Sequence, residues 1–218
     1  MIPLLNRIGA IGDVHAEDQA LAAALEFFEQ QAIDRILCVG DLADGPGDLG
    51  RCCQLLRGHA VDVVRGNHDR WVLTDTMREL PDASPTPDAE TRAYLESLPT
   101  TRDYQTAHGA VLLCHGLGDD DMSGVGPDDF GYGLEANQPL QELLAARRYR
   151  FVINGHTHKP MARCFGDITI INVGTLFRDH QPSIAVIDFD ALQVTFHQLE
   201  GASVGGRTAA HSLAPVPS

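Results

Sequence analysis

Three short apolar runs near the N-terminus each lead into a polar sequence that begins with glycine. The runs cover residues 8–11, 35–39 and 61–64, and the polar sequences are Gly12-Asp13-Val14-His15, Gly40-Asp41 and Gly66-Asn67-His68-Asp69. Apolar residues at helical spacing predict helices between the runs, over about residues 17–31 and 49–57. Alternating strands and helices predict a parallel sheet with helices outside it, with functional side chains at the carboxyl ends of the strands. We therefore expect these polar residues to meet along one edge of a sheet.

Two further strand ends of the same kind follow later in the chain. A predicted hairpin over about residues 103–114 ends at His115-Gly116, and an apolar run over 150–154 leads into Gly155-His156-Thr157-His158. These two imidazoles, two positions apart at the exit of a predicted strand, can converge on a metal site if a turn follows at once. Gly155 permits a sharp turn, and Pro160 prevents the strand from continuing. The pair alone is weak evidence for a metal site, and the upstream strand ends give it weight.

The remaining segments complete one predicted domain over residues 1–200. Residues 71–99 are expected to form a short helical insertion, either a cap over the polar edge or a plain surface excursion. Residues 118–133 predict an acidic, glycine-rich loop, followed by a helix near 139–148, a hairpin over 163–173 and a strand pair over 183–198. From residue 201 the Gly, Ala, Ser and Pro content predicts a flexible tail, 201–218, with no part in the core.

The charge balance limits the partners of this chain. Its 218 residues include 16 Lys and Arg against 30 Asp and Glu, a formal net charge of −14. Such a chain should repel long nucleic acid, because nonspecific binding to a phosphate backbone depends on clustered cations. Any phosphate chemistry must therefore rely on a local positive charge, such as a metal ion.

Cysteine use and hydropathy predict a cytoplasmic protein without a membrane segment. The five cysteines are odd in number and form no Cys-x-x-Cys pattern, which favours reduced, mostly buried thiols over disulfides. The apolar residues before Arg7 are too few for a signal peptide. No run approaches the roughly 20 apolar residues that span a bilayer.

Taken together, the five strand ends resemble the motifs of the calcineurin-like metallophosphoesterase superfamily, in the family's order from Gly12 to His158. The resemblance implies an α/β fold of four layers (α/β/β/α), with two mixed sheets packed between helices. It also implies two divalent transition-metal ions, with Mn favoured over Fe, Zn, Ni or Co, and the available oxygen and imidazole donors suit these ions. The first ion would be held by Asp13, His15, Asp41 and His158, and the second by Asp41, Asn67, His115 and His156.

The same resemblance implies hydrolysis of a phosphoester. A hydroxide bridging the two ions would attack phosphorus, and a net charge of about +1 at the centre would attract phosphate. His68 matches the family's general acid for the leaving group. Asp44 matches the carboxylate that orients this histidine, although the residue also suits a plain turn before Gly45.

Departures from the family pattern narrow the branch. Ser/Thr phosphatases of the superfamily carry Gly-Asp-x-x-Asp-Arg-Gly, and this chain has Gly45 in place of that arginine. The short chain, the Gly-Asn-His-Asp sequence and Asn172-Val173-Gly174-Thr175 are similar to small bacterial and archaeal phosphodiesterases. Substitute substrate-binding candidates are Arg178, Arg70 and Asn67, with Arg178 favoured, although each arginine also suits a structural role.

We therefore predict a dinuclear metal-dependent phosphodiesterase or phosphatase that acts on a small phosphoester. Nucleotides are among the candidate substrates. One alternative is a phosphomonoesterase acting on phosphoproteins or dinucleoside polyphosphates. Another is a non-catalytic interaction module like the metallophosphoesterase-like subunit of retromer. Loss of metal ligands would mark that module, and the motifs here retain all of them.

Overall fold

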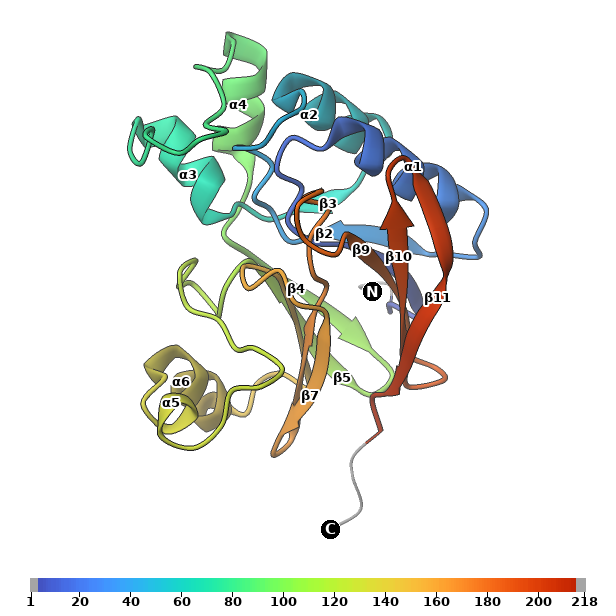
Figure 1. The fold of residues 1–218 in the computed structure, drawn as a ribbon. Coiled ribbons are helices and arrows are strands. Elements are labelled where there is room, and N and C mark those ends of the chain that lie inside the picture. The colour runs from blue at the N-terminus through green and yellow to red at the C-terminus, as the bar shows by residue number, and fades with distance from the viewer. Residues whose placement is uncertain (1–3, 215–218) are drawn as a thin grey trace.

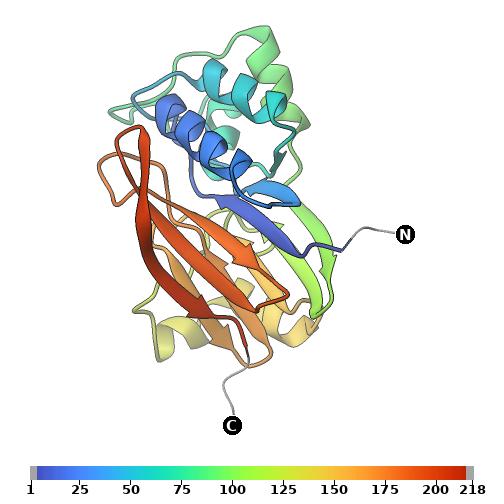
Figure 2. The same cartoon turned by 90° about the vertical axis from the view of Figure 1, so that its right-hand side faces the viewer.

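Two β-sheets packed face to face form the centre of the molecule (Figures 1 and 2). The computed structural model describes residues 4–214, apart from the side chains of residues 207–209. The first sheet contains, in spatial order, β11 (Ser203–Ser212), β10 (Gln193–Glu200), β9 (Ser183–Asp188), β1 (Arg7–Ile11), β2 (Arg35–Cys38) and β3 (Asp62–Val63). The second contains β4 (Thr101–Thr106), β5 (Gly109–Cys114), β6 (Phe151–Asn154), β8 (Ile168–Asn172) and β7 (Met161–Phe165).

Helices cover the outer face of each sheet. The first sheet is covered by α1 (Asp18–Glu29), α2 (Leu49–Gly58), α3 (Asn67–Thr74) and α4 (Ala89–Ser97). The second carries α5 (Tyr132–Glu135) and α6 (Gln138–Ala146). The order helix, sheet, sheet, helix confirms the four-layer α/β fold with two mixed sheets.

The two-residue period of the strands sorts side chains between these layers. In β5, Val111 and Leu113 face the core between the sheets, whereas Leu112 and Cys114 face α6. In β1, Ile8 and Ala10 lie in the inter-sheet core, and Ile11 packs under the helices. Strands buried on both faces must be apolar throughout, which explains the continuous apolar runs in the sequence.

The parallel sheet expected from the first three strands is only part of its sheet. β1 pairs with β2, and β2 with β3, in parallel, whereas β9 lies antiparallel to β1. Both hairpins and the β9–β10 pair occur where the sequence predicted them. Parallel β1, β2 and β3 place their carboxyl ends at one edge, and β5 and β6 do the same in the second sheet.

The C-terminal segment is ordered, so the prediction of a flexible tail from residue 201 is wrong for residues 203–213. β11 pairs antiparallel with β10 at the edge of the first sheet, and Leu213 is fully buried in the inter-sheet core. Small residues such as Gly and Ala weaken the strand pattern, but an edge strand needs only backbone pairing on one side and one anchoring side chain. Residues 215–218 of the predicted tail lie outside the described residues.

Segment 71–99 departs from its expected boundaries. The first helix begins at Asn67 rather than near residue 71, and α4 follows after the irregular residues 75–88. Within residues 4–214 no helix has the length and apolar character needed to cross a bilayer. All five cysteines are free thiols, and four of them are buried, as the sequence predicted.

Candidate metal centre

The carboxyl ends of five strands meet at one site between the two sheets. Asp13 follows β1, Asp41 follows β2, Asn67 opens α3 after β3, His115 follows β5, and His156 and His158 follow β6. A backbone hydrogen bond of 2.9 Å from Gly155 N to the His115 oxygen ties together the ends of β5 and β6. Asp13, Asp41, Asn67 and His115 are almost completely buried. The fold thus brings together polar residues separated by up to 145 positions in the sequence (13 to 158).

The backbone at this site is strained. His15, Asp41, Asp44, His156 and His158 have φ angles between +47° and +66°. This left-handed region is uncommon for residues other than glycine and persists only where neighbouring interactions enforce it. Here the Asp41 carbonyl oxygen accepts hydrogen bonds from Val14 N and His15 N. Such clustered strain is typical of functional sites.

Gly155 allows the second sheet to approach Asp13. A Cβ atom at this position would lie 2.3 Å from the Asp13 Oδ1 atom, so no other residue fits without a shift. The close approach lets His156 N donate a hydrogen bond of 3.2 Å to that oxygen. The turn that the sequence predicted from Gly155 therefore also fixes the position of a carboxylate.

One group of facing donors consists of Asp13, His15 and His158. The Nε2 atoms of His15 and His158 are 3.0 Å apart, and His158 Nε2 lies 3.2 Å from Asp13 Oδ2. His15 Nδ1 is 2.8 Å from the Asp44 carbonyl oxygen, so it carries the proton, and Nε2 presents its lone pair. Burial lowers the pKa of His15. Burial and the neighbouring His15 lower the pKa of His158 to about 3. Both rings are therefore neutral near pH 7, the form that binds metal.

A second group surrounds Asn67. Its Oδ1 atom lies 2.9 Å from His115 Nε2 and 3.1 Å from His156 Nδ1, and His115 Nε2 lies 3.3 Å from Asp41 Oδ2. His115 Nδ1 donates to the Val39 carbonyl oxygen at 2.9 Å, so the neutral form of this ring presents its lone pair on Nε2. With the Asn67 amide reversed, its nitrogen could donate to both rings. With Oδ1 inward, several lone pairs face one point, an arrangement that suits a cation.

The electrostatics of the centre call for positive charge. Asp13 and Asp41 are fully buried together, and burial raises the pKa of Asp13 to about 7 despite the opposing charge of His115. Burial lowers the pKa of His115, but the carboxylates of Asp41 and Asp13 raise it to about 10. Asp13 Oδ2 is buried without a hydrogen-bond partner among the described residues. Oxygen and imidazole donors around buried carboxylates, without thiolate, fit divalent transition-metal ions.

His68 lies beside these donors but faces another partner. Its Nδ1 atom is 2.8 Å from Asp44 Oδ2, and its ring stands against Trp71 with centroids 4.5 Å apart. Burial lowers the pKa of His68, but the hydrogen bond to Asp44 and the charge of Asp41 raise it above its ordinary value. His15, Asp41 and His68 also form a cluster of possible metal donors, which the sequence did not predict.

The two arginines predicted to bind substrate are both paired with carboxylates. Arg178 binds Glu17 through Nε and Nη2, at 2.8 and 2.7 Å. Arg70 binds Asp121 of the acidic loop through the same two atoms, at 2.7 and 2.8 Å. Neither Glu17 nor Asp121 was predicted as a partner, because nothing in the local pattern marks contacts 161 and 51 residues apart.

Sequence reasoning also missed Arg78 and Ser84, which bind Asp44. Arg78 Nη1 and Nη2 donate to the two carboxylate oxygens of Asp44 at 3.0 and 2.6 Å. Ser84 N donates to Asp44 Oδ1 at 2.8 Å, and Asp44 N donates to Ser84 Oγ at 2.8 Å. Segment 75–88 therefore reaches the site and is more than a surface excursion.

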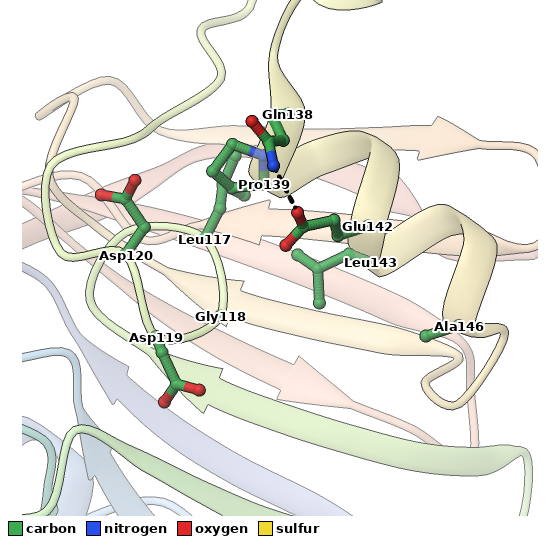
Figure 3. Close-up of a pocket in the computed structure, with 9 residues that line it drawn as sticks. All are labelled: Leu117, Gly118, Asp119, Asp120, Gln138, Pro139, Glu142, Leu143 and Ala146. Atoms are coloured by element: carbon green, nitrogen blue, oxygen red, sulfur yellow. Dashed lines mark hydrogen bonds between the residues drawn. The ribbon is translucent and has the colours of Figure 1, made fainter.

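A cavity of about 590 Å³ lies outside this centre, between residues 117–120 and α6 (Figure 3). Its polar lining is acidic, and Asp120 and Glu142 already accept hydrogen bonds from their own neighbours. In Figure 3 the Gln138 side chain donates a hydrogen bond to Glu142, which lies four residues further along α6. Such a lining repels phosphate, so the metal centre remains the candidate site.

Comparisons with known proteins agree with the fold of the chain. A metallophosphoesterase from Sphaerobacter thermophilus superposes with a TM-score of 0.67 at 24% identity, covering 90% of this chain and 89% of the other. An archaeal phosphodiesterase superposes with a TM-score of 0.58 at 15% identity, covering 88% and 99%. Protein MJ0912 of Methanocaldococcus jannaschii is 35% identical over 68 residues, which span 31% of this chain and only 28% of that protein.

The family assignment rests on a longer match. The model of the calcineurin-like phosphoesterase superfamily domain matches residues 7–192, which include every donor of the centre. The two mixed sheets, the joined strand ends and this match lead to one conclusion: the chain belongs to the calcineurin-like phosphoesterase superfamily.

Proposed function

We propose that this protein is a dinuclear metal-dependent phosphodiesterase that hydrolyses small phosphodiesters. The observation that carries the proposal is that Asp41 belongs to two clusters of facing donors, one with His15 and His68 and the other with Asp13 and His115. Asp13, His15, Asp41 and His158 would hold one divalent ion, and Asp41, Asn67, His115 and His156 the other. Mn is our first candidate for both positions. When bound, such ions supply positive charge for the phosphate and lower the pKa of a water molecule to near neutrality.

The side chains around the donors have distinct tasks in this proposal. The carbonyl oxygens of Asp44 and Val39 hold His15 and His115 in the tautomer that presents Nε2. Asp44 orients His68 through Nδ1, so that Nε2 can give a proton to the leaving alkoxide. The raised pKa of His68 suits this task, because more of the acid form is then present near neutral pH.

The proposed substrate is small and contains a single phosphodiester linkage. The net charge of −14 disfavours a polyanion, whereas the local charge of the metals can attract one phosphate group. Arg70 and Arg178 remain candidates for substrate contact, although each would first have to release its carboxylate partner. The resemblance of the Gly-Asn-His-Asp sequence to small phosphodiesterases supports a diester, and Gly45 argues against phosphoproteins.

Asp41→Asn tests the proposal, since this residue is common to both donor sets. The variant should fold, bind less Mn and lose more than about 100-fold of its turnover of bis(p-nitrophenyl) phosphate, since loss of outer-shell partners alone costs about 10–100-fold. Metal content after dialysis and the Mn-dependent rise in Tm provide readouts separate from activity. His108→Ala serves as control, because His108 lies in the β4–β5 turn. Undiminished Mn binding and turnover in Asp41→Asn would overturn the dinuclear centre.

A further inference from the structure

Asp44 is held on one side by His68 and on the other by groups from a single segment of the chain. Its side chain is 3% exposed, and its two carboxylate oxygens accept four hydrogen bonds, two on each oxygen. One comes from His68, and three come from Arg78 and Ser84 in the segment between α3 and α4 (residues 75–88). Asp44 thus lies between the proposed acid and this segment.

Asp44 serves two neighbours at once. Its carboxylate accepts from His68 Nδ1, while its backbone oxygen accepts from His15 Nδ1. Its φ angle of +64° is left-handed, a conformation that aspartate adopts more readily than most residues other than glycine. The paired hydrogen bonds with Ser84 fix the backbone, and the two-pronged bond to Arg78 fixes the carboxylate plane.

The guanidinium group of Arg78 binds both Asp44 and its own segment, since Nη1 also donates to the Ser84 carbonyl oxygen at 3.4 Å. Besides the two bonds to Asp44, Nε donates to the Thr76 carbonyl oxygen at 3.0 Å. Asp75 and Met77, just before Arg78 in the chain, adopt left-handed backbone conformations with φ angles of +55° and +53°. Asp75 is the C-cap of α3, where a left-handed residue is common, and the contacts with Asp44 hold the segment that follows it.

The chain has no room for an arginine directly after Asp44. A Cβ atom at Gly45 would lie 1.8 Å from the His15 carbonyl oxygen, against fixed backbone. A guanidinium group beside Asp44 must therefore come from elsewhere, and Arg78 provides it from 34 residues away. It binds the carboxylate rather than facing the donors, so its task differs from that of a phosphate-binding arginine.

We propose that Arg78 is a positioning residue that acts through Asp44 on His68: it holds the Asp44 carboxylate in the plane from which that group orients the imidazole of the proposed acid. The inference rests on the proposed function for its chemical consequence, but the geometry that it describes exists without catalysis. Arg78 touches no reacting atom. Its loss should affect the protonation of the leaving group and leave metal binding intact.

The kinetic test compares two phosphodiesters that differ in their leaving group, methyl phenyl phosphate and methyl p-nitrophenyl phosphate. Phenoxide is the more basic leaving group and needs a proton, whereas p-nitrophenoxide leaves readily as an anion. In the Mn-loaded protein, Arg78→Met should lower kcat for the phenyl ester by about 10–100-fold, the usual effect of losing an outer-shell partner. The loss for the nitrophenyl ester should be at least about tenfold smaller, and KM and Mn content should not change.

Two further variants separate positioning from a general loss of structure. Arg92→Ala is the matched control, because Arg92 ties α4 to α3 through the Leu73 carbonyl oxygen but makes no contact with Asp44. It should leave both rates unchanged. Arg78→Lys should recover part of the phenyl-ester rate. Equal losses for both esters, or no loss, in Arg78→Met would overturn the inference.

A measurement without turnover keeps the two proposals distinguishable. Two-bond nitrogen–proton NMR of the Zn²⁺-loaded protein reports the tautomer of each imidazole, with the His68 signal assigned from His68→Asn. At a pH high enough for His68 to be neutral, Arg78→Met should convert it from a single Nδ1–H tautomer to a mixture, and Arg92→Ala should not. Inactivity of the wild-type protein towards both esters would overturn the proposed function alone, whereas an unchanged His68 tautomer in Arg78→Met would overturn the positioning.

Discussion

Two irregular segments flank the candidate centre, and each makes a two-pronged ion pair with the framework. Segment 75–88 brings Arg78 to a carboxylate on the framework, Asp44, whose side chain is 3% exposed. The acidic loop brings Asp121 to a cation on the framework, Arg70, and these two side chains are 23% and 40% exposed. The pairs have similar geometry and very different surroundings.

The difference in burial decides what each pair can do. A charge pair near the surface is screened by water and contributes little to stability. A carboxylate that is removed from water and loses one partner leaves an uncompensated charge, which is costly. We therefore expect segment 75–88 to stabilise the site and the acidic loop to contribute little to the stability of the site. The variants below test this contrast in order of expected effect.

Asp44→Asn should have the largest effect, because it removes the charge on which His68 and Arg78 both depend. Asparagine keeps the shape and tolerates the left-handed backbone. We expect kcat for methyl phenyl phosphate to fall by about 10²–10⁴-fold, the range for loss of general acid catalysis. Steady-state kinetics with Mn provides the measurement. A loss equally large for methyl p-nitrophenyl phosphate would mean that Asp44 acts on the metals instead of on the leaving group.

Leu213→Ala should show what a purely structural loss looks like, far from both segments. Leu213 is fully buried in the inter-sheet core, so truncation should lower the free energy of unfolding by about 2–5 kcal/mol. Urea denaturation measures this change, and the ratio of rates for the two esters should stay at the wild-type value. Leu4→Ala is the control, since Leu4 is 50% exposed. Equal stability of the two variants would contradict the anchoring of β11.

Arg78→Ala should also lower stability, by about 1–3 kcal/mol, the cost of leaving a buried polar group unsatisfied. Asp44 would keep its bonds to His68 and Ser84, which limits the loss. Urea denaturation of the metal-free protein measures the effect without a contribution from bound ions. Arg92→Ala, which breaks a more exposed pair with Glu96, should cost less. The reverse order would show that Asp44 does not depend on Arg78.

Asp121→Asn should have the smallest effect, about 0.2–1 kcal/mol, as for other exposed ion pairs. The difference from wild type should shrink further in high salt, because screening weakens interactions between exposed charges. Urea denaturation at low and high ionic strength tests both points. A loss above about 2 kcal/mol, or a leaving-group effect like that of Arg78→Met, would place the acidic loop in the same class as segment 75–88.

Much of the centre could be predicted from the amino-acid sequence, because its signals are local. Glycine followed by Asp, Asn or His at the end of an apolar run is visible at each strand separately, and parallel strands bring such ends together. The structure accordingly joins Asp13, Asp41, Asn67, His115 and His158. The roles of these residues as metal ligands stay predictions, as does the role of His68.

Long-range partners could not be predicted in the same way. The contacts of Arg78 with Asp44, Arg70 with Asp121 and Arg178 with Glu17 depend on how irregular segments fold back, and no periodic pattern encodes this. The ordered β11 was missed for a related reason, since its small residues carry little strand signal and its pairing with β10 supplies the stability.

What the sequence specified and what the tertiary structure decided thus differ in the range of the interactions involved. Residue type and spacing along the chain were enough to specify the apolar layers, the strand ends and the chemistry of the donors, because each depends on short-range periodicity. Only the packed molecule showed which carboxylate each arginine neutralises. Only there is it visible that Gly45 leaves the position beside Asp44 to Arg78. Burial and distance set the strength of those contacts, and both arise only when distant parts of the chain meet.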